Sequence, residues 1–194
     1  WGHGDALAGV VVVALVSAAS LGLVVLAYGN GGAPLGAVLL TTLALEAAMV
    51  GAAVRLGPRG RGPTTLLFGP RRLRTWPLFG WAALAFFASL LLTAGYVSLA
   101  ERVSADLVPP ALPLELIGSG LRWLAFLIIV LAGPASEEVF FRGFLFAGLL
   151  RRFGAPGAMV ISAAVFAAAH LDVALLGPAF LAGIAFAYVY WRTG

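Results

Sequence analysis

Residues 131–146 read LAGPASEEVFFRGFLF. Two adjacent glutamates, Glu137 and Glu138, and one arginine, Arg142, interrupt an otherwise apolar run. About 20 apolar residues are enough to cross the hydrocarbon core of a bilayer. A charged side chain at that depth costs roughly 2.5–3.5 kcal/mol on insertion scales. Charges in this position therefore face a protein interior or a wet cavity, and they point to function.

The composition of the whole chain is that of a membrane protein. Of its 194 residues, 62% are hydrophobic and only 10% are charged, and the mean hydropathy is +1.04. A soluble domain is about half apolar and a quarter charged. The absence of cysteine excludes disulfides and thiol catalysis. We therefore expect a multi-pass protein of the cell membrane, and the Ala-, Gly- and Arg-rich composition suggests a bacterial source.

Six apolar segments predict an all-α fold, a polytopic bundle of about six transmembrane helices. Turns rich in glycine and proline separate them. The segments cover residues 6–28, 35–56, 76–99, 121–150, 158–171 and 173–190. We expect residues 1–120 to form N-terminal transmembrane helices with a basic loop, and residues 121–194 to form a catalytic core.

The arginines predict an orientation. Residues 59–74 contain five arginines and no acid, and cytoplasmic loops collect basic residues. If all six segments cross, Arg151, Arg152 and Arg192 fall on the same side, and the acidic segment 101–115 falls outside. All twelve basic residues are arginine and cluster at these borders, so the net charge of +4 does not indicate nucleic-acid binding.

Helical spacing assigns different roles to the two central glutamates. Glu138 and Arg142 are four residues apart, so they share a helix face and can pair. Glu137 is rotated from Glu138 by about 100° and has no basic residue three or four positions away. Its carboxylate is therefore free to act as a general base. The Gly133–Pro134 pair just upstream can kink the helix and open room for water.

A histidine on the next predicted span is the candidate partner for Glu137. Phe166 and His170 are four residues apart and share a face. Glu137 and His170 each lie 14 residues from the turn between them, about 21 Å along a helix, so an antiparallel hairpin brings them to one level. We expect His170 to belong to the site. Asp172 either orients the imidazole or marks the helix end.

The strings EEVFFRG and FAAAH resemble the first two motifs of the CPBP family, also called the Abi or CAAX protease family. Its pattern is E-E-x-x-x-R, then F-x-x-x-H on the next helix, then H-x-x-x-N or H-x-x-x-D on a later one. The first motif is matched by Glu137, Glu138 and Arg142, and the second by Phe166 and His170. The resemblance covers residues 131–194, and the order and spacing of the two motifs make it specific.

The resemblance implies peptide-bond hydrolysis inside the membrane by a CAAX-protease-like endopeptidase of the glutamate type. Glu137 and His170 would activate a water, while Glu138 and Arg142 would hold the helix. The third motif would stabilise the oxyanion, worth roughly 2.7–4 kcal/mol per donor. Because the sequence ends at Gly194 before that motif, we expect this stretch alone to be nearly inactive.

The implied partners are membrane lipid and a peptide or protein substrate, with no nucleic acid. Two glutamates and a histidine could also bind zinc, which commonly takes three protein ligands and a water. The zinc-protease string H-E-x-x-H is absent, so nothing in the sequence requires a metal, and we expect no cofactor.

Two other functions remain open at this point. One is a non-catalytic membrane scaffold or immunity protein that keeps the motifs for packing. The other is a proton-coupled transporter that uses Glu46, Glu137 and Glu138, although no repeated halves are evident. Glu46 is alone on its span and could snorkel or meet Arg122 or Arg142. The identity of the substrate and the oligomeric state stay open.

Overall fold

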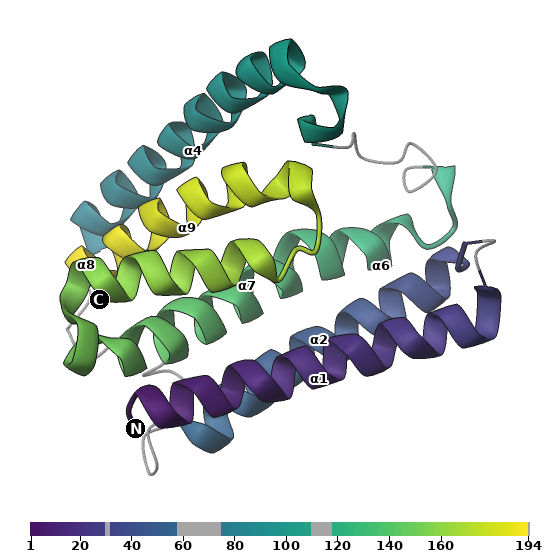
Figure 1. Ribbon diagram of the computed structural model, residues 1–194, viewed down its shortest axis with the longest axis horizontal. Helices are drawn as coiled ribbons and strands as arrows, with labels where there is room; N and C mark the ends of the chain where they lie inside the picture. The colour runs from purple at the N-terminus through teal and green to yellow at the C-terminus, as the bar shows by residue number, and fades with distance from the viewer. Residues whose placement is uncertain (30–31, 58–74, 110–117, 194) are drawn as a thin grey trace.

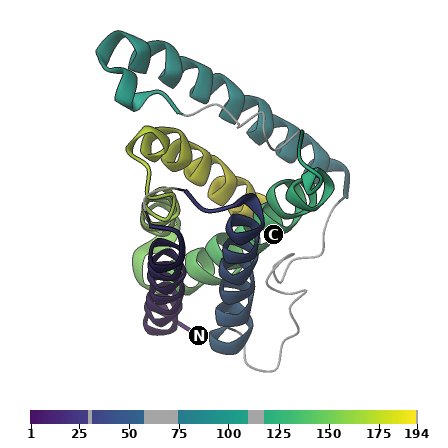
Figure 2. The same ribbon diagram turned by 90° about the vertical axis from the view of Figure 1, so that its right-hand side faces the viewer.

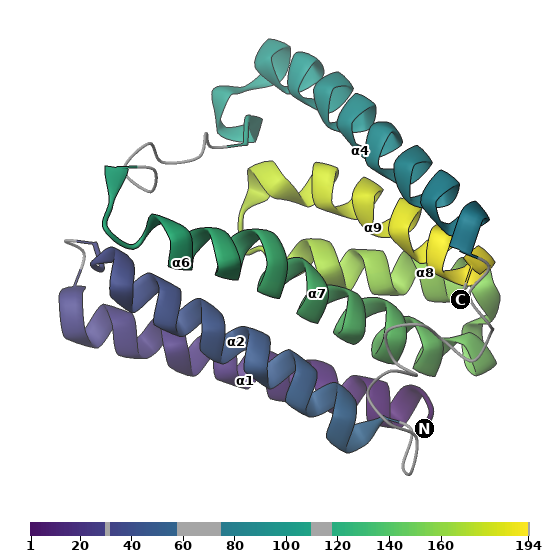
Figure 3. The same cartoon turned by 180° about the vertical axis from the view of Figure 1, so that it is seen from behind.

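The computed structural model describes residues 1–29, 32–57, 75–109 and 118–193, and all regular structure in those residues is helical. Helices α1 and α2 lie side by side along one face, and α4 lies on the opposite face (Figures 1 and 2). The helices from α6 to α9 fill the space between them (Figure 3). The predicted all-α bundle is confirmed.

The N-terminal helices follow the predicted segments closely. α1 (His3–Tyr28) and α2 (Leu35–Leu56) pack against each other as an antiparallel pair (Figure 1). α4 (Thr75–Val103) runs four residues past its predicted end, and a short 3₁₀ turn, η2 (Ala105–Leu107), follows it. The basic loop predicted at residues 59–74 lies outside the described residues, and the acidic segment is described only as far as residue 109.

A long helical stretch carries the glutamates. It consists of α6 (Arg122–Phe126), the π-helical segment η3 (Leu127–Ala132), α7 (Gly133–Glu137), the π-helical segment η4 (Glu138–Phe146) and the first turns of α8 (Ala147–Ala168). The backbone stays helical through Gly133, with φ −55° and ψ −64°. The Gly133–Pro134 pair therefore does not interrupt the helix, and the kink that the sequence suggests there stays a prediction. Wider π turns on both sides accommodate the proline, which has no N–H to donate.

The chain reverses inside α8 at Gly154, within the predicted turn. Gly154 has φ 66° and ψ 177°, a conformation that a side chain would disfavour. Five helices are long and apolar enough to cross a membrane, and one of them, Arg122–Ala168, contains this reversal. That stretch therefore supplies two of the six helical passes in the described part of the chain.

Small residues bring the last helix close to its neighbour. α9 (Val173–Thr193) packs against the second arm of α8 and against α4. A Cβ on Gly183 would lie 2.9 Å from the Cβ of Ala163, and a Cβ on Gly177 would overlap the ring of Tyr96. Close approach at small residues is a common way for membrane helices to associate.

The ends of the chain agree with the predicted topology. The indole Nε1 of Trp1 donates to the carbonyl of Phe144 at 3.0 Å, and Arg152 Nη1 lies 3.2 Å from His3 Nε2. The N-terminus, the turn at Gly154 and the end of α9 therefore lie at one end of the bundle (Figure 1). Which side of the membrane this end faces stays a prediction.

Candidate active site

The π-helical segment η4 forms the centre of the bundle. Each residue from Val139 to Phe146 is buried. Four helices, α1, α2, α8 and α9, contact it and cover its side chains. The ring of Phe140 lies 5.6 Å from that of Phe144, and the ring of Phe141 lies 5.0 Å from that of Phe166. This aromatic core fixes the helix whose first turn carries the acids.

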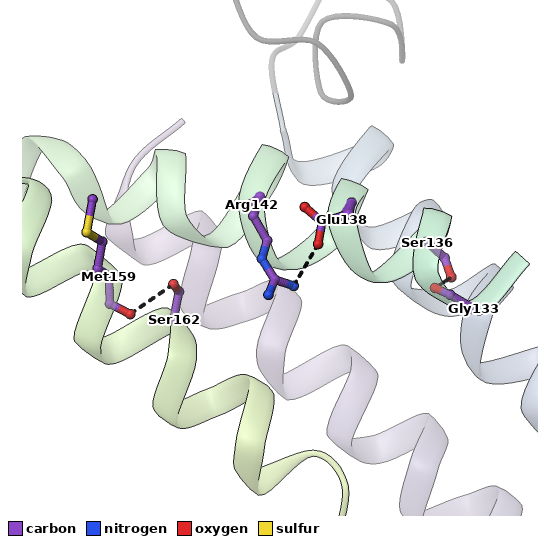
Figure 4. Close-up of polar contacts among 6 residues, drawn as sticks. All are labelled: Gly133, Ser136, Glu138, Arg142, Met159 and Ser162. Atoms are coloured by element: carbon purple, nitrogen blue, oxygen red, sulfur yellow. Dashed lines mark hydrogen bonds and ion pairs between the residues drawn. The ribbon is translucent and has the colours of Figure 1, made fainter. Parts of the chain in front are cut away.

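Arg142 is held within that core. It is 1% exposed, and its Nη1 lies 3.2 Å from Oε1 of Glu138, whose side chain is 43% exposed (Figure 4). The guanidinium carbon lies 4.6 Å from the ring centre of Phe166 and 5.3 Å from that of Phe186. These distances allow cation–π attraction on two sides. The predicted pairing of Glu138 with Arg142 is confirmed, and two aromatic rings lie within cation–π distance of the guanidinium.

Glu137 has no such partner. It is the last residue of α7 and is half-buried. Among the residues that the structure describes, no hydrogen bond or ion pair reaches its carboxylate. His170 and Arg142 are nevertheless close enough for their charges to act on it. This carboxylate is thus unpaired, as the spacing predicted, and it lies near the guanidinium of Arg142 and the imidazole of His170.

His170 lies in the turn after α8, because the helix ends at Ala168 and not at the predicted residue 171. Its Nδ1 lies 2.9 Å from the carbonyl oxygen of Phe166. A carbonyl can only accept, so Nδ1 carries the hydrogen and Nε2 of the neutral ring is left as an acceptor. The next residue, Leu171, has φ 52°, which is unusual for a residue with a side chain.

Phe166 connects the two arms of the hairpin at this point. Its ring contacts Phe141, the Arg142 guanidinium and the ring of His170, the last with 4.9 Å between centres. The four predicted site residues therefore come to one place in the bundle. They are Glu137, Glu138, Arg142 and His170. Their catalytic roles stay predictions.

Comparison with known families agrees with this geometry. Residues 119–194 match the model of the Rce1-like family, described as "Type II CAAX prenyl endopeptidase Rce1-like". This segment belongs to the CAAX protease family. The match supports peptide-bond hydrolysis in a membrane as the general activity of the CAAX protease segment, with a peptide or protein as substrate. No curated protein and no solved structure matches the chain.

Asp172 marks a helix end in the CAAX protease segment. Its Oδ1 accepts a hydrogen bond from the backbone N–H of Ala174 at 2.8 Å, which caps the start of α9. The histidine two residues earlier donates instead to Phe166. Of the two roles considered for Asp172, the structure therefore shows the cap.

Glu46 lies beside the CAAX protease segment and was not predicted to join its site. It is 8% exposed, so it does not snorkel, and it forms no ion pair with Arg122 or Arg142 among the described residues. Both predicted partners are therefore wrong. Its neighbours are Gly133 and the charge of Glu137. The only sequence signal was a lone acid in the middle of an apolar span.

The side chains of the site do not form an evident metal-binding cluster. Within the described ranges, no group of three or more His, Cys, Asp or Glu residues is arranged to hold a metal ion. The expectation that the CAAX protease segment needs no cofactor stays a prediction.

Proposed function

We propose that the protein is an intramembrane endopeptidase that hydrolyses a peptide bond with a water activated by Glu137 and His170. One observation carries the proposal: an unpaired carboxylate lies within electrostatic reach of an imidazole whose Nε2 is left to accept a hydrogen bond. A general base needs an accessible lone pair close to the attacking water. The family match supports the reaction class.

In the proposed reaction, the water oxygen attacks the scissile carbonyl carbon while one water proton passes to the carboxylate of Glu137. His170 accepts a hydrogen bond from the same water through Nε2 and orients it. The tetrahedral intermediate collapses as the C–N bond breaks. Glu137 then returns its proton to the departing nitrogen, while the second water proton stays on the acyl oxygen, which leaves a carboxylic acid and an amine as products. This route needs no cofactor, because Glu137 supplies the base.

Glu138 and Arg142 have a supporting role in this scheme. The guanidinium is fixed by two rings and by Glu138, so the first turn of η4 has little freedom. Its positive charge also acts on Glu137. We propose that this pair sets the direction of the Glu137 side chain without exchanging a proton with the substrate.

Substitution of Glu137 by glutamine tests the proposal. The amide keeps the shape but cannot take a proton from water, so we expect peptide cleavage to fall by about 100-fold or more. The protein, expressed from its complete reading frame, would be placed in liposomes. It would receive a peptide ending in a prenylated CAAX sequence and the same peptide without the prenyl group. Cleavage would be followed by mass spectrometry.

The matched control is Asp172→Asn, which lies near His170 but caps a helix, and asparagine caps as well as aspartate. This variant should cleave at the wild-type rate. Equal cleavage by wild type and Glu137→Gln would contradict the proposal. Proton-coupled transport that Glu137→Gln abolishes would favour a transporter, and partner binding that survives the substitution without any cleavage would favour a scaffold.

A further inference from the structure

The carboxyl group of Glu46 has no place in the family motifs, and its surroundings set it apart from the other charges. It lies midway along α2 and is almost fully buried. Its Oε2 has no hydrogen-bond partner among the described residues. An unpartnered carboxyl group is costly in an apolar interior, and an apolar side chain of similar volume packs as well or better. Packing alone does not account for an acid at this position.

Glu46 faces the start of the helix that carries Glu137. A Cβ on Gly133 would lie 3.2 Å from Oε1 of Glu46, so the missing side chain leaves space for the carboxyl group. Gly133 and Glu137 are four residues apart and lie on one face of α7, and α2 packs against both α7 and η4. The charge of Glu137 acts on Glu46. The two carboxyl groups are therefore neighbours across the contact between α2 and α7.

In the pair formed by Glu46 and Glu137, the nearby basic side chains lie closer to Glu137. Arg142 and His170 both act on Glu137, and Arg142 also pairs with Glu138. The charged or titratable residues on the elements next to α2 are His3, Asp5, Tyr28, Arg122, Glu137, Glu138 and Arg142. Of these described residues, Glu137 is the one whose charge acts on Glu46.

Two neighbouring carboxylates in an apolar interior do not both ionise without cations to offset them. One proton therefore stays with the pair. Because the guanidinium of Arg142 acts on Glu137 and not on Glu46, the negative charge is best placed on Glu137 and the proton is best placed on Glu46. A protonated carboxyl group is a hydrogen-bond donor.

We propose that Glu46 is a positioning residue for the hydrolysis: its protonated carboxyl group donates a hydrogen bond to Glu137, directly or through one water. This bond selects which Glu137 oxygen meets the attacking water. The inference rests on the proposed function of Glu137. The water proton still passes to Glu137, and Glu46 keeps its own proton throughout the cycle.

Three variants of α2 test this role with the same liposome assay. Glu46→Gln keeps a donor in place, so kcat should stay within about threefold of wild type. Glu46→Leu removes the donor and leaves Glu137 loosely held, so kcat should fall roughly 10- to 100-fold with KM unchanged. The control is Met49→Ala, a buried position about one turn along α2 whose side chain carries no titratable group. It should lower the thermal midpoint and leave the pH profile unchanged.

The pH profile of kcat separates positioning from packing. At high pH Glu46 loses its proton, which removes the donor and adds a second negative charge beside Glu137, so the wild-type rate should fall. Glu46→Gln cannot ionise, so its rate should persist to higher pH than that of wild type. If Glu46→Leu fails to fold, the pH profiles of wild type and Glu46→Gln still show whether Glu46 acts as a hydrogen-bond donor.

Two results would overturn the inference: a Glu46→Gln profile that coincides with wild type, or a Glu46→Gln rate as low as that of a folded Glu46→Leu. Failure of the proposed function gives a different result, because Glu137→Gln would then cleave normally in the same assay. The inference about Glu46 and the proposal about Glu137 can therefore fail separately.

Discussion

Helices α1 and η4 are both apolar, yet they occupy opposite environments. α1 has a mean hydropathy of 2.8 over its most apolar window, and only Ala6, Gly9 and Val13 are buried along its length. η4 contains Glu138 and Arg142 and directly follows Glu137, and it is buried from Val139 to Phe146. The most hydrophobic helix thus lies at the edge, and the helix with charges lies in the centre.

Burial in a membrane bundle follows charge more closely than hydropathy. Lipid tails solvate an apolar helix as well as protein does, so hydropathy identifies a span without saying whether it is central. Lipid cannot solvate a charge, so a helix that carries one must be covered by protein or meet water. Charges together with large aromatic rings mark the core of this bundle better than hydropathy does.

Of the substitutions considered for stability, Arg142→Leu in η4 should lower the free energy of unfolding the most. The substitution removes the cation between the rings of Phe166 and Phe186 and leaves Glu138 without its partner. Loss of one member of a buried pair costs about 3–5 kcal/mol, and the value should fall at the low end because Glu138 is partly exposed. The measurement is the free energy of unfolding in detergent, followed by circular dichroism.

Arg122→Leu is the matched control, because Arg122 is exposed at the start of the same helical stretch. An exposed substitution of this kind should change stability by no more than about 0.5 kcal/mol. Equal stability of the two variants would mean that Arg142 does not organise the core.

Much of this contrast could be predicted from the sequence, since it depends on local patterns. The bounds of α2, the pairing of Glu138 with Arg142 and the reversal near Gly154 follow from apolar length, four-residue spacing and a glycine-rich turn. The CAAX protease motifs themselves are read directly from the order of their residues.

The rest depends on long-range contacts or on the backbone bonding pattern. The π turns of η3 and η4 do not follow from a hydrophobic period of 3.6, because they depend on which carbonyl each N–H meets. The place of Glu46 requires knowing that α2 meets α7 at Gly133, about ninety residues away in the chain. The position of His170 outside the helix depends on Asp172 capping the next one.

Truncation of one large side chain in η4 and one in α1 tests whether the two helices are packed differently. Phe144 is fully buried in η4, whereas Leu26 of α1 is 85% exposed. Phe144→Ala should cost about 2 kcal/mol, below the roughly 3–5 kcal/mol of soluble proteins, because the cavity remains but transfer from water does not contribute. Leu26→Ala should change the free energy of unfolding by less than about 0.5 kcal/mol. Similar losses from the two truncations would show that the regions are not packed differently.

Two glycines of α1 offer the finest test, because one touches η4 and the other touches nothing. A Cβ on Gly9 would overlap the ring of Phe144, while a Cβ on Gly22 meets no atom within 4 Å. The ring has little room to move, since Phe140 packs beside it and Trp1 binds the Phe144 carbonyl. Gly9→Val should therefore destabilise the protein by about 1 kcal/mol, the overpacking cost less the gain in helix propensity.

Gly22→Val should act in the opposite direction. It relieves the poor helix propensity of glycine without meeting a neighbour, so it should stabilise the protein by a few tenths of a kcal/mol, about the propensity difference. The thermal midpoints of the two variants, measured in one detergent, would then lie on either side of wild type. If both shift the same way, α1 does not rest on η4 at Gly9. In that case α1 would contact η4 at other residues, and the contrast between a lipid-facing α1 and a protein-covered η4 would not hold.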